Sequence, residues 1–71
     1  MSNIQDIIPF MKKGWVAMDK DKHWWWFSKK PVINKEYSDW YIGCEMGDVS
    51  VPFKITPADD WTKSLIKVGG K

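Results

Sequence analysis

The apolar and polar positions of this chain follow the two-residue period of short β-strands. The clearest alternation spans residues 49–55, where every second residue is valine, phenylalanine or isoleucine, and Pro52 favours an edge strand or a bulge. Residues 15–18, 23–28 and 40–45 are further strand-like runs that contain many aromatic and β-branched residues. Polar turns or connections separate these runs at residues 19–22, 32–39 and 46–48. The pattern therefore predicts a chain of short strands joined by turns.

Helical signals are confined to the two ends of the chain. Near the start, Ser2 or Asn3 suits an N-cap, but Pro9 limits the helix that follows to about one turn. Residues 1–13 are therefore expected to form a short turn or arm on the sheet. The apolar residues that this arm is expected to lay on the sheet are Ile4, Ile7, Ile8 and Phe10.

The C-terminal part of the chain opens with a helix-start pattern. Thr56 suits an N-cap, Pro57 the first helical position and Asp59 the first turn, so one helical or 3₁₀ turn carrying Trp61 is expected. Residues 64–68 either extend that helix or form a fifth strand. Their β-branched residues, and the benefit of closing a small sheet, favour the strand.

These elements predict a mainly β fold, namely a small, strongly bent antiparallel sheet or barrel-like roll of four or five strands with one short helical turn. Residues 1–71 are expected to form a single domain, with an N-terminal arm over 1–13, a β core over 14–68 and a frayed tail over 69–71. One cysteine (Cys44) and one histidine (His23) cannot form an internal disulfide or a zinc site. Stability is therefore expected to come from packing of large aromatic side chains.

The hairpin over residues 14–28 is the centre of the predicted fold, because it holds four of the six tryptophans. A turn that pairs Met18 with His23 places Ala17 opposite Trp24, and a slip of one residue would exchange the two faces. With this register, the predicted core comprises Trp15, Ala17, Trp24, Trp26, Trp40, Val49, Val51, Phe53, Ile55, Trp61 and Leu65. The outward face, which contains the histidine and lies beside the charged turn, comprises the candidate binding residues Val16, Met18, His23, Trp25 and Phe27.

The composition argues against several kinds of chemistry. The few histidine, cysteine and serine residues form no recognisable catalytic constellation, so neither enzymatic activity nor a cofactor is expected. The turn at residues 19–22 lacks the glycine and the later glutamate of a calcium loop, so no metal is expected there. All eleven basic residues are lysine and the net charge is +2, which disfavours nucleic acid as a partner. No apolar run has the length of a membrane or signal segment, so a cytoplasmic protein is expected.

The run from Gly14 to Pro31 resembles a pattern found in small uncharacterised proteins of bacteriophages and prophages. Its components are a Trp-Val-Ala strand, an Asp-Lys-Asp turn, an aromatic strand and a Lys-Pro pair, and Trp40 and residues 60–65 extend the likeness over residues 14–66. Members of that group often have glycine where Lys22 or His23 stands here. The resemblance implies a phage origin and no known activity. Small phage proteins commonly bind and block a host protein, including components of anti-phage defence such as CRISPR effectors.

These observations predict a non-enzymatic protein that acts in the cytoplasm of the host cell. Its expected partner is a host or phage protein, bound through the outward aromatic face, and the expected effect is inhibition of a host process or of anti-phage defence. Homodimerisation through the same face is one alternative, and a purely structural role of the aromatic residues is another. A further alternative is a single-stranded nucleic-acid-binding module that stacks bases on exposed rings, with nearby lysines meeting the phosphates.

Overall fold

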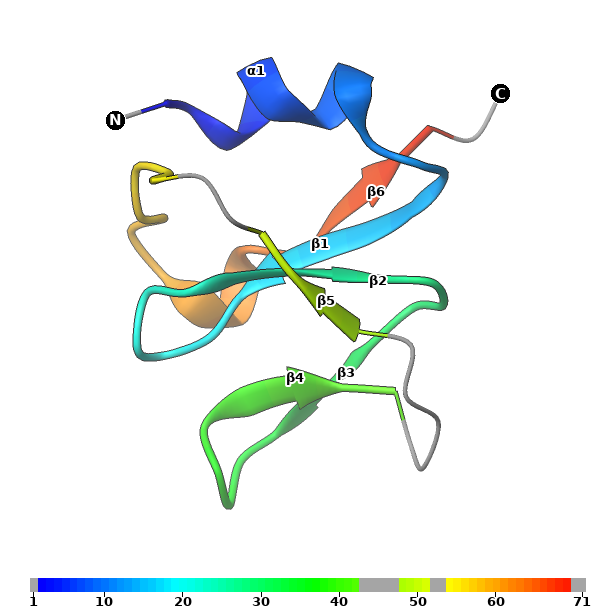
Figure 1. The fold of residues 1–71 in the computed structure, drawn as a ribbon. Coiled ribbons are helices and arrows are strands. Elements are labelled where there is room, and N and C mark those ends of the chain that lie inside the picture. Colours follow the sequence, from blue (N-terminus) through cyan, green and yellow to red (C-terminus); the bar gives the residue numbers. More distant parts are fainter. Residues whose placement is uncertain (1, 43–47, 52–53, 70–71) are drawn as a thin grey trace.

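The computed structural model describes residues 2–42, 48–51 and 54–69. Within these ranges the protein is mainly β, as predicted, with six strands in two antiparallel sheets, and the larger sheet is not closed into a barrel. The larger sheet has the strand order β5-β2-β1-β6 (Figure 1). Its strands are β1 (Gly14–Met18), β2 (Trp24–Phe27), β5 (Asp48–Ser50) and β6 (Ile66–Val68). The smaller sheet is the hairpin of β3 (Val32–Asn34) and β4 (Asp39–Tyr41).

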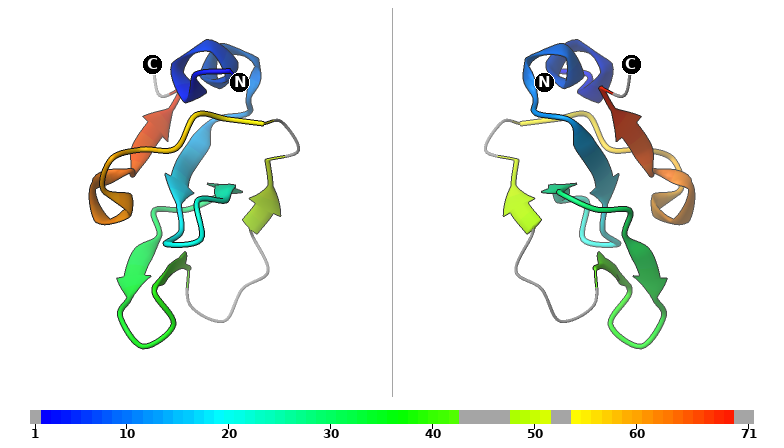
Figure 2. Two further views of the ribbon diagram at one scale, coloured as in Figure 1. Left: turned by 90° about the vertical axis from the view of Figure 1, so that its left-hand side faces the viewer. Right: turned by 90° about the vertical axis from the view of Figure 1, so that its right-hand side faces the viewer.

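The N-terminal arm is helical and lies at the opposite end of the molecule from the β3–β4 hairpin (Figure 2). It consists of α1 (Ile4–Ile7) and the 3₁₀ turn η1 (Ile8–Phe10). Asn3 caps α1, since its side chain accepts a hydrogen bond from the backbone N–H of Gln5 at 3.0 Å. Ile4 is buried, but Phe10 is 88% exposed, so the prediction that Phe10 packs on the sheet is wrong. Phe10 is the last residue of the 3₁₀ turn that follows α1, where the chain leaves the arm toward β1.

The β1–β2 register differs by one residue from the predicted one. Met18 pairs with Trp24 and Ala17 with Trp25, so His23 belongs to the turn and not to the strand. The turn is closed by the N–H of Asp19, which donates to the carbonyl of His23 at 3.0 Å, and Lys22 adopts a positive φ of 72° within it. The longer turn therefore places Trp24 and Trp26 on the same face as Met18 and Val16, and not on the face of Trp15 and Ala17 as predicted.

Both faces of this hairpin are covered by apolar side chains, whereas the prediction had one buried face and one exposed face. One core, beneath the helical arm, contains Ile4, Val16, Met18, Trp24, Val51, Ile55 and Val68. The other contains Ala17, Phe27 and Trp40, with Trp15, Trp25, Ile33, Ile42, Trp61 and Leu65 packed against them. The strands β1 and β2 thus lie between two apolar layers, and most of their large side chains serve stability.

The strand predicted over residues 49–55 differs from the one in the structure. Val49, predicted to be buried, is 57% exposed, because it lies on an edge strand where the helical arm leaves the sheet uncovered. The alternating run 49–55 does not form one strand: β5 ends at Ser50, and Ile55 makes only an isolated bridge with Ser2. Phe53 and the later part of the predicted strand 40–45 lie outside the described residues.

The connection predicted over residues 32–39 is instead largely the β3–β4 hairpin, which pairs Ile33 with Trp40. The predicted fifth strand is confirmed as β6, which pairs with β1. The predicted helical turn is η2 (Trp61–Lys63), capped by Asp60 and not by Thr56, because the Asp60 side chain accepts from the N–H of Thr62 at 3.0 Å. Among the described residues, no helix is both long and apolar enough to cross a membrane.

Candidate functional site

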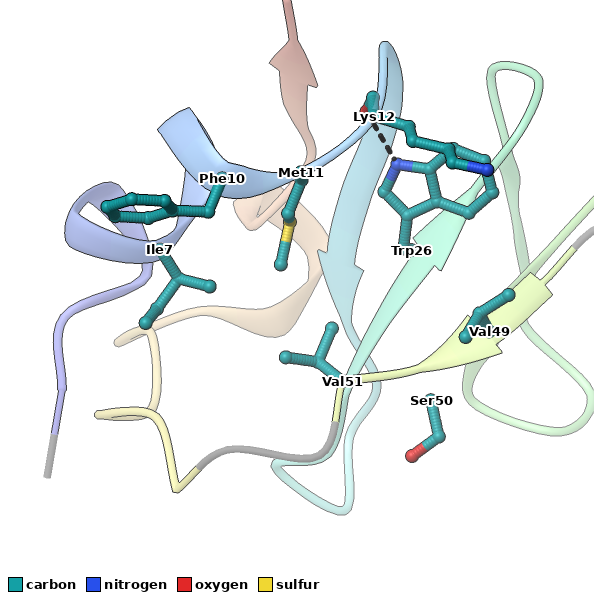
Figure 3. A pocket seen from close by; sticks show the side chains of 8 residues that line it. All are labelled: Ile7, Phe10, Met11, Lys12, Trp26, Val49, Ser50 and Val51. Atoms are coloured by element: carbon teal, nitrogen blue, oxygen red, sulfur yellow. Dashed lines mark hydrogen bonds between the residues drawn. The ribbon is translucent and has the colours of Figure 1, made fainter.

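An apolar groove of about 500 Å³ opens where the core beneath the helical arm reaches the surface. The helical arm and the segment after it form one side, and strands β2 and β5 form the other (Figure 3). The residues that line it are Ile7, Phe10, Met11, Lys12, Trp26, Val49, Ser50 and Val51. Its volume falls within the usual range of ligand-binding pockets.

Trp26 is a fixed wall of this groove. Its indole N–H donates a hydrogen bond to the carbonyl of Lys12 at 3.0 Å, which ties the ring to the segment that follows the helical arm (Figure 3). The ring also depends on the absence of a side chain at Gly14. A Cβ atom there would lie 2.5 Å from the Phe27 carbonyl oxygen and 2.7 Å from Cζ2 of Trp26. The hydrogen bond orients the indole, and the space left by Gly14 lets the ring lie close to β1, so the groove is already open in the protein without a partner.

Two of the lining residues of the groove are large apolar side chains that are mostly exposed. Phe10 is 88% exposed on the side of the helical arm, and Val49 is 57% exposed on β5. Removing such surface from water is favourable by about 25 cal/mol per Å². Exposed apolar side chains beside a preformed apolar groove are typical of protein-binding sites.

Strand β5 contributes Val49 and Ser50 to the lining of the groove and is an edge strand of the larger sheet. The N–H of Val51 donates to the Trp24 carbonyl at 3.1 Å, so the backbone at Val51 faces β2. Because the hydrogen-bonding direction alternates along an antiparallel strand, the N–H and C=O of Ser50 point away from β2. The groove thus combines an apolar cavity with backbone groups directed outward.

The predicted binding residues do not form this site or any continuous exposed face. Val16, Met18 and Phe27 are 0%, 3% and 1% exposed, which corrects the prediction that they point outward. The cause is the one-residue difference in register together with the second core. Trp25 is half-buried, and only His23 is exposed.

His23 instead joins the turn to β5, through a residue that the sequence analysis did not single out. Its ring Nε2 is hydrogen-bonded to the hydroxyl of Ser50, and the ring packs edge-on against Trp25 at 5.0 Å between centroids. Asp21 accepts a hydrogen bond from the backbone N–H of His23 at 2.9 Å, which orders the turn. The bond between His23 and Ser50 then connects this turn to β5.

A second, polar cavity of about 350 Å³ lies between the β1–β2 turn and the β3–β4 hairpin. Asp19 spans the junction, since its Oδ1 accepts a hydrogen bond from the N–H of Trp40 at 3.0 Å. Burial, with contributions from the charges of Asp39 and Asp21, raises the pKa of Asp19 to about 6, against the opposing effect of the Trp40 hydrogen bond. Within the described ranges, no group of three or more histidine, cysteine or acidic side chains is placed to hold a metal ion.

Trp15 carries a concentration of positive charge beside its aromatic ring. The ammonium groups of Lys30 and Lys67 lie 5.7 Å and 5.9 Å from the ring centroid, within the range of cation–π contacts. The Trp15 ring is half-buried, and both lysines are exposed. This cluster lies on the face of β1 opposite to the one that carries Val16.

Sequence reasoning missed the groove because its rim residues gave weak signals. Phe10 directly follows a proline that ends the helical pattern, and Val49 opens an alternating run that reads as buried. The one available pointer was Pro52, which indicated an edge strand near Val49. Comparison of the chain with protein-family models, with curated proteins and with solved structures gives no match.

Proposed function

We propose that this protein is a non-enzymatic binding module that recognises another protein through the apolar groove. The observation that carries the proposal is the combination of a preformed cavity of about 500 Å³ with two rim residues, Phe10 and Val49, that are 88% and 57% exposed. The fold orders Trp26 as a wall of this cavity and leaves the cavity open. Interface cores are enriched in aromatic residues and methionine, and Trp26, Phe10 and Met11 are of these types.

The class of partner follows from the resemblance of residues 14–66 to small phage and prophage proteins. A host or phage protein in the cytoplasm of the host cell is the proposed partner, and inhibition of a host process or of anti-phage defence is the proposed outcome. The groove replaces the hairpin face as the proposed binding surface, because the hairpin residues lie largely in the cores.

Site-specific photo-crosslinking in bacterial cells tests this proposal. A benzophenone side chain in place of Phe10 is expected to give a protein adduct of reproducible mass. The same group in place of Tyr37, which is 70% exposed on the loop of the β3–β4 hairpin, is the matched control. The adduct at position 10 is expected to disappear with Val49→Asp. It is expected to remain with the control change Val32→Asp, since Val32 is similarly exposed (54%) but lies in β3, at the end of the molecule opposite to the helical arm. Equal adducts from the two positions, or none from position 10, would refute a groove-specific protein partner.

A second candidate function is single-stranded nucleic-acid binding, favoured by the two ammonium groups close to the Trp15 ring. In this alternative, a base stacks on Trp15 while Lys30 and Lys67 contact phosphates. Its signature is quenching of tryptophan fluorescence by an oligonucleotide, weaker at high salt and weaker with Lys30→Gln and Lys67→Gln. An unchanged fluorescence spectrum at low salt removes this candidate.

A further inference from the structure

We infer that the partner enters the groove as an extended strand that pairs with the outer edge of β5. In this arrangement, one apolar side chain of the partner occupies the groove and a neighbouring carboxylate meets Lys12. The inference rests on the proposed function and specifies its mode of recognition.

The backbone of β5 supplies the first argument. The strand pairs with β2 on one side, and among the described residues no strand pairs with its other side. The Val51 N–H is directed to Trp24, so alternation directs the N–H and C=O of Ser50 outward. Outward backbone groups on an edge strand are a template for one more strand, and strand addition is a common mode of peptide recognition.

The position of the cavity relative to that edge supplies the second argument. Val49, Ser50 and Val51 all line the groove, so a strand added along β5 would run beside it. In Figure 3, Val49 and Ser50 point to opposite sides of β5, as expected for alternating side chains. An added strand alternates in the same way. Every second side chain would therefore be directed toward the groove and the Trp26 wall, and the intervening ones away from it.

Charge decides between a different protein and a second copy of this chain. Among the lining residues that the structure describes, Lys12 alone is charged, and it is exposed. A two-fold axis that paired two copies through this groove would bring their Lys12 side chains to the same interface, where like charges repel. A partner strand with an aspartate or glutamate beside its apolar residue instead meets Lys12 with the opposite charge. The occupant is therefore an acidic, apolar strand of a different protein.

A library of short random peptides is the probe that tests this mode, because it samples many side-chain patterns in an extended chain. We expect selected peptides to contain a large apolar residue next to aspartate or glutamate and to avoid proline. Val49→Asp or Phe10→Ser is expected to weaken their binding by about tenfold or more, whereas the matched changes Val32→Asp and Tyr37→Ser have little effect. Lys12→Glu should weaken binding by about fivefold, with Lys20→Glu in the distant β1–β2 turn as its control.

Backbone N-methylation of the best peptide gives the decisive readout. N-methylation at every second amide removes the hydrogen bonds to β5, and is expected to lower affinity by about tenfold, while methylation at the intervening amides changes it by less than about twofold. One contrary result is a set of peptides that bind through the groove with equal sensitivity to N-methylation at all amides, and another is a set with apolar residues spaced three and four apart as in a helix. Either result would overturn the strand mode and leave the proposed protein-binding function intact. A dimer by light scattering that Val49→Asp dissociates would overturn the choice of partner. Absence of any groove-dependent peptide, together with absence of the Phe10 adduct, would overturn both.

Discussion

Replacing Asp19 with asparagine is expected to stabilise the protein at neutral pH. Burial raises the pKa of this carboxyl from 3.8 to about 6, and the charges of Asp39 and Asp21 act in the same direction. The neighbouring Asp39 has a buried Oδ1 with no hydrogen-bond partner, so a second negative charge at this junction is poorly compensated. Asparagine keeps an oxygen that accepts the Trp40 N–H, and it carries no charge.

The magnitude follows from the change in pKa. A rise from 3.8 to about 6 corresponds to about 3 kcal/mol, at about 1.4 kcal/mol per pH unit. Because Asp19 is only half-buried, solvent screening reduces this to about 1 kcal/mol. The folded pKa lies above the unfolded one, so the folded state binds the proton more tightly. The contribution of Asp19 to the free energy of unfolding is therefore complete below about pH 4 and is lost as the pH rises through about 6.

Urea unfolding followed by tryptophan fluorescence, repeated between about pH 4 and pH 7.5, measures this effect. The free-energy difference between Asp19→Asn and the wild-type protein is expected to grow by about 1 kcal/mol in favour of asparagine across that interval. Asp59→Asn, which removes an exposed carboxylate elsewhere, controls for the loss of one negative charge. A difference that stays constant with pH, or that grows in favour of aspartate, would contradict the assigned cause.

Three further substitutions test how the fold is held. Ser64→Ala is expected to lower the free energy of unfolding by about 1–3 kcal/mol in urea, because the buried hydroxyl accepts the Met18 N–H at 2.8 Å; a loss below about 0.5 kcal/mol would contradict this. Gly14→Ala is expected to cost about 1–3 kcal/mol and to lower the Tm, since the new Cβ would lie 2.5 Å from the Phe27 carbonyl oxygen; an unchanged Tm would show that the site relaxes freely. Lys22→Gly is expected to raise stability by about 0.5 kcal/mol, because glycine adopts the φ of 72° without steric strain; a fall in the urea midpoint would show that the strain is small.

The strands were predictable where alternation or β-branched residues are strong, but their register was not. Residues 24–27 are all aromatic, so their pattern does not distinguish one face from the other. The second core depends on Trp40 of β4, which packs with Ala17 and Phe27. The sequence pattern does not predict which distant segment covers this face of the hairpin. Strand β4 overlaps the strand predicted over residues 40–45, but its partner β3 was missed because it is only three residues long and lies in a segment that is otherwise polar.

The candidate site was less predictable than the fold, because exposure is set by tertiary packing. Phe10 and Val49 have the same residue types as core positions, and only the geometry of the arm and of the sheet edge leaves them open. The same limit applies to Val16, Met18 and Phe27, whose burial depends on layers contributed by distant segments. Chemistry that needs a particular residue type was easier to judge from composition than a surface defined by shape.

The apolar character of both faces of β2 makes the β1–β2 turn the main source of conformational specificity in this hairpin. In most half-buried strands a one-residue slip exposes apolar side chains, and that penalty protects the native pairing. Here a β2 strand shifted by one residue would still present aromatic rings to both apolar layers. The free-energy difference between the two pairings therefore depends largely on the turn, namely on the hydrogen bond from the Asp19 N–H to the His23 carbonyl and on the positive φ of Lys22. Exchanges among the aromatic residues should therefore leave one native state. An insertion or deletion in the turn should instead produce two interconverting pairings, which would be visible as doubled backbone resonances.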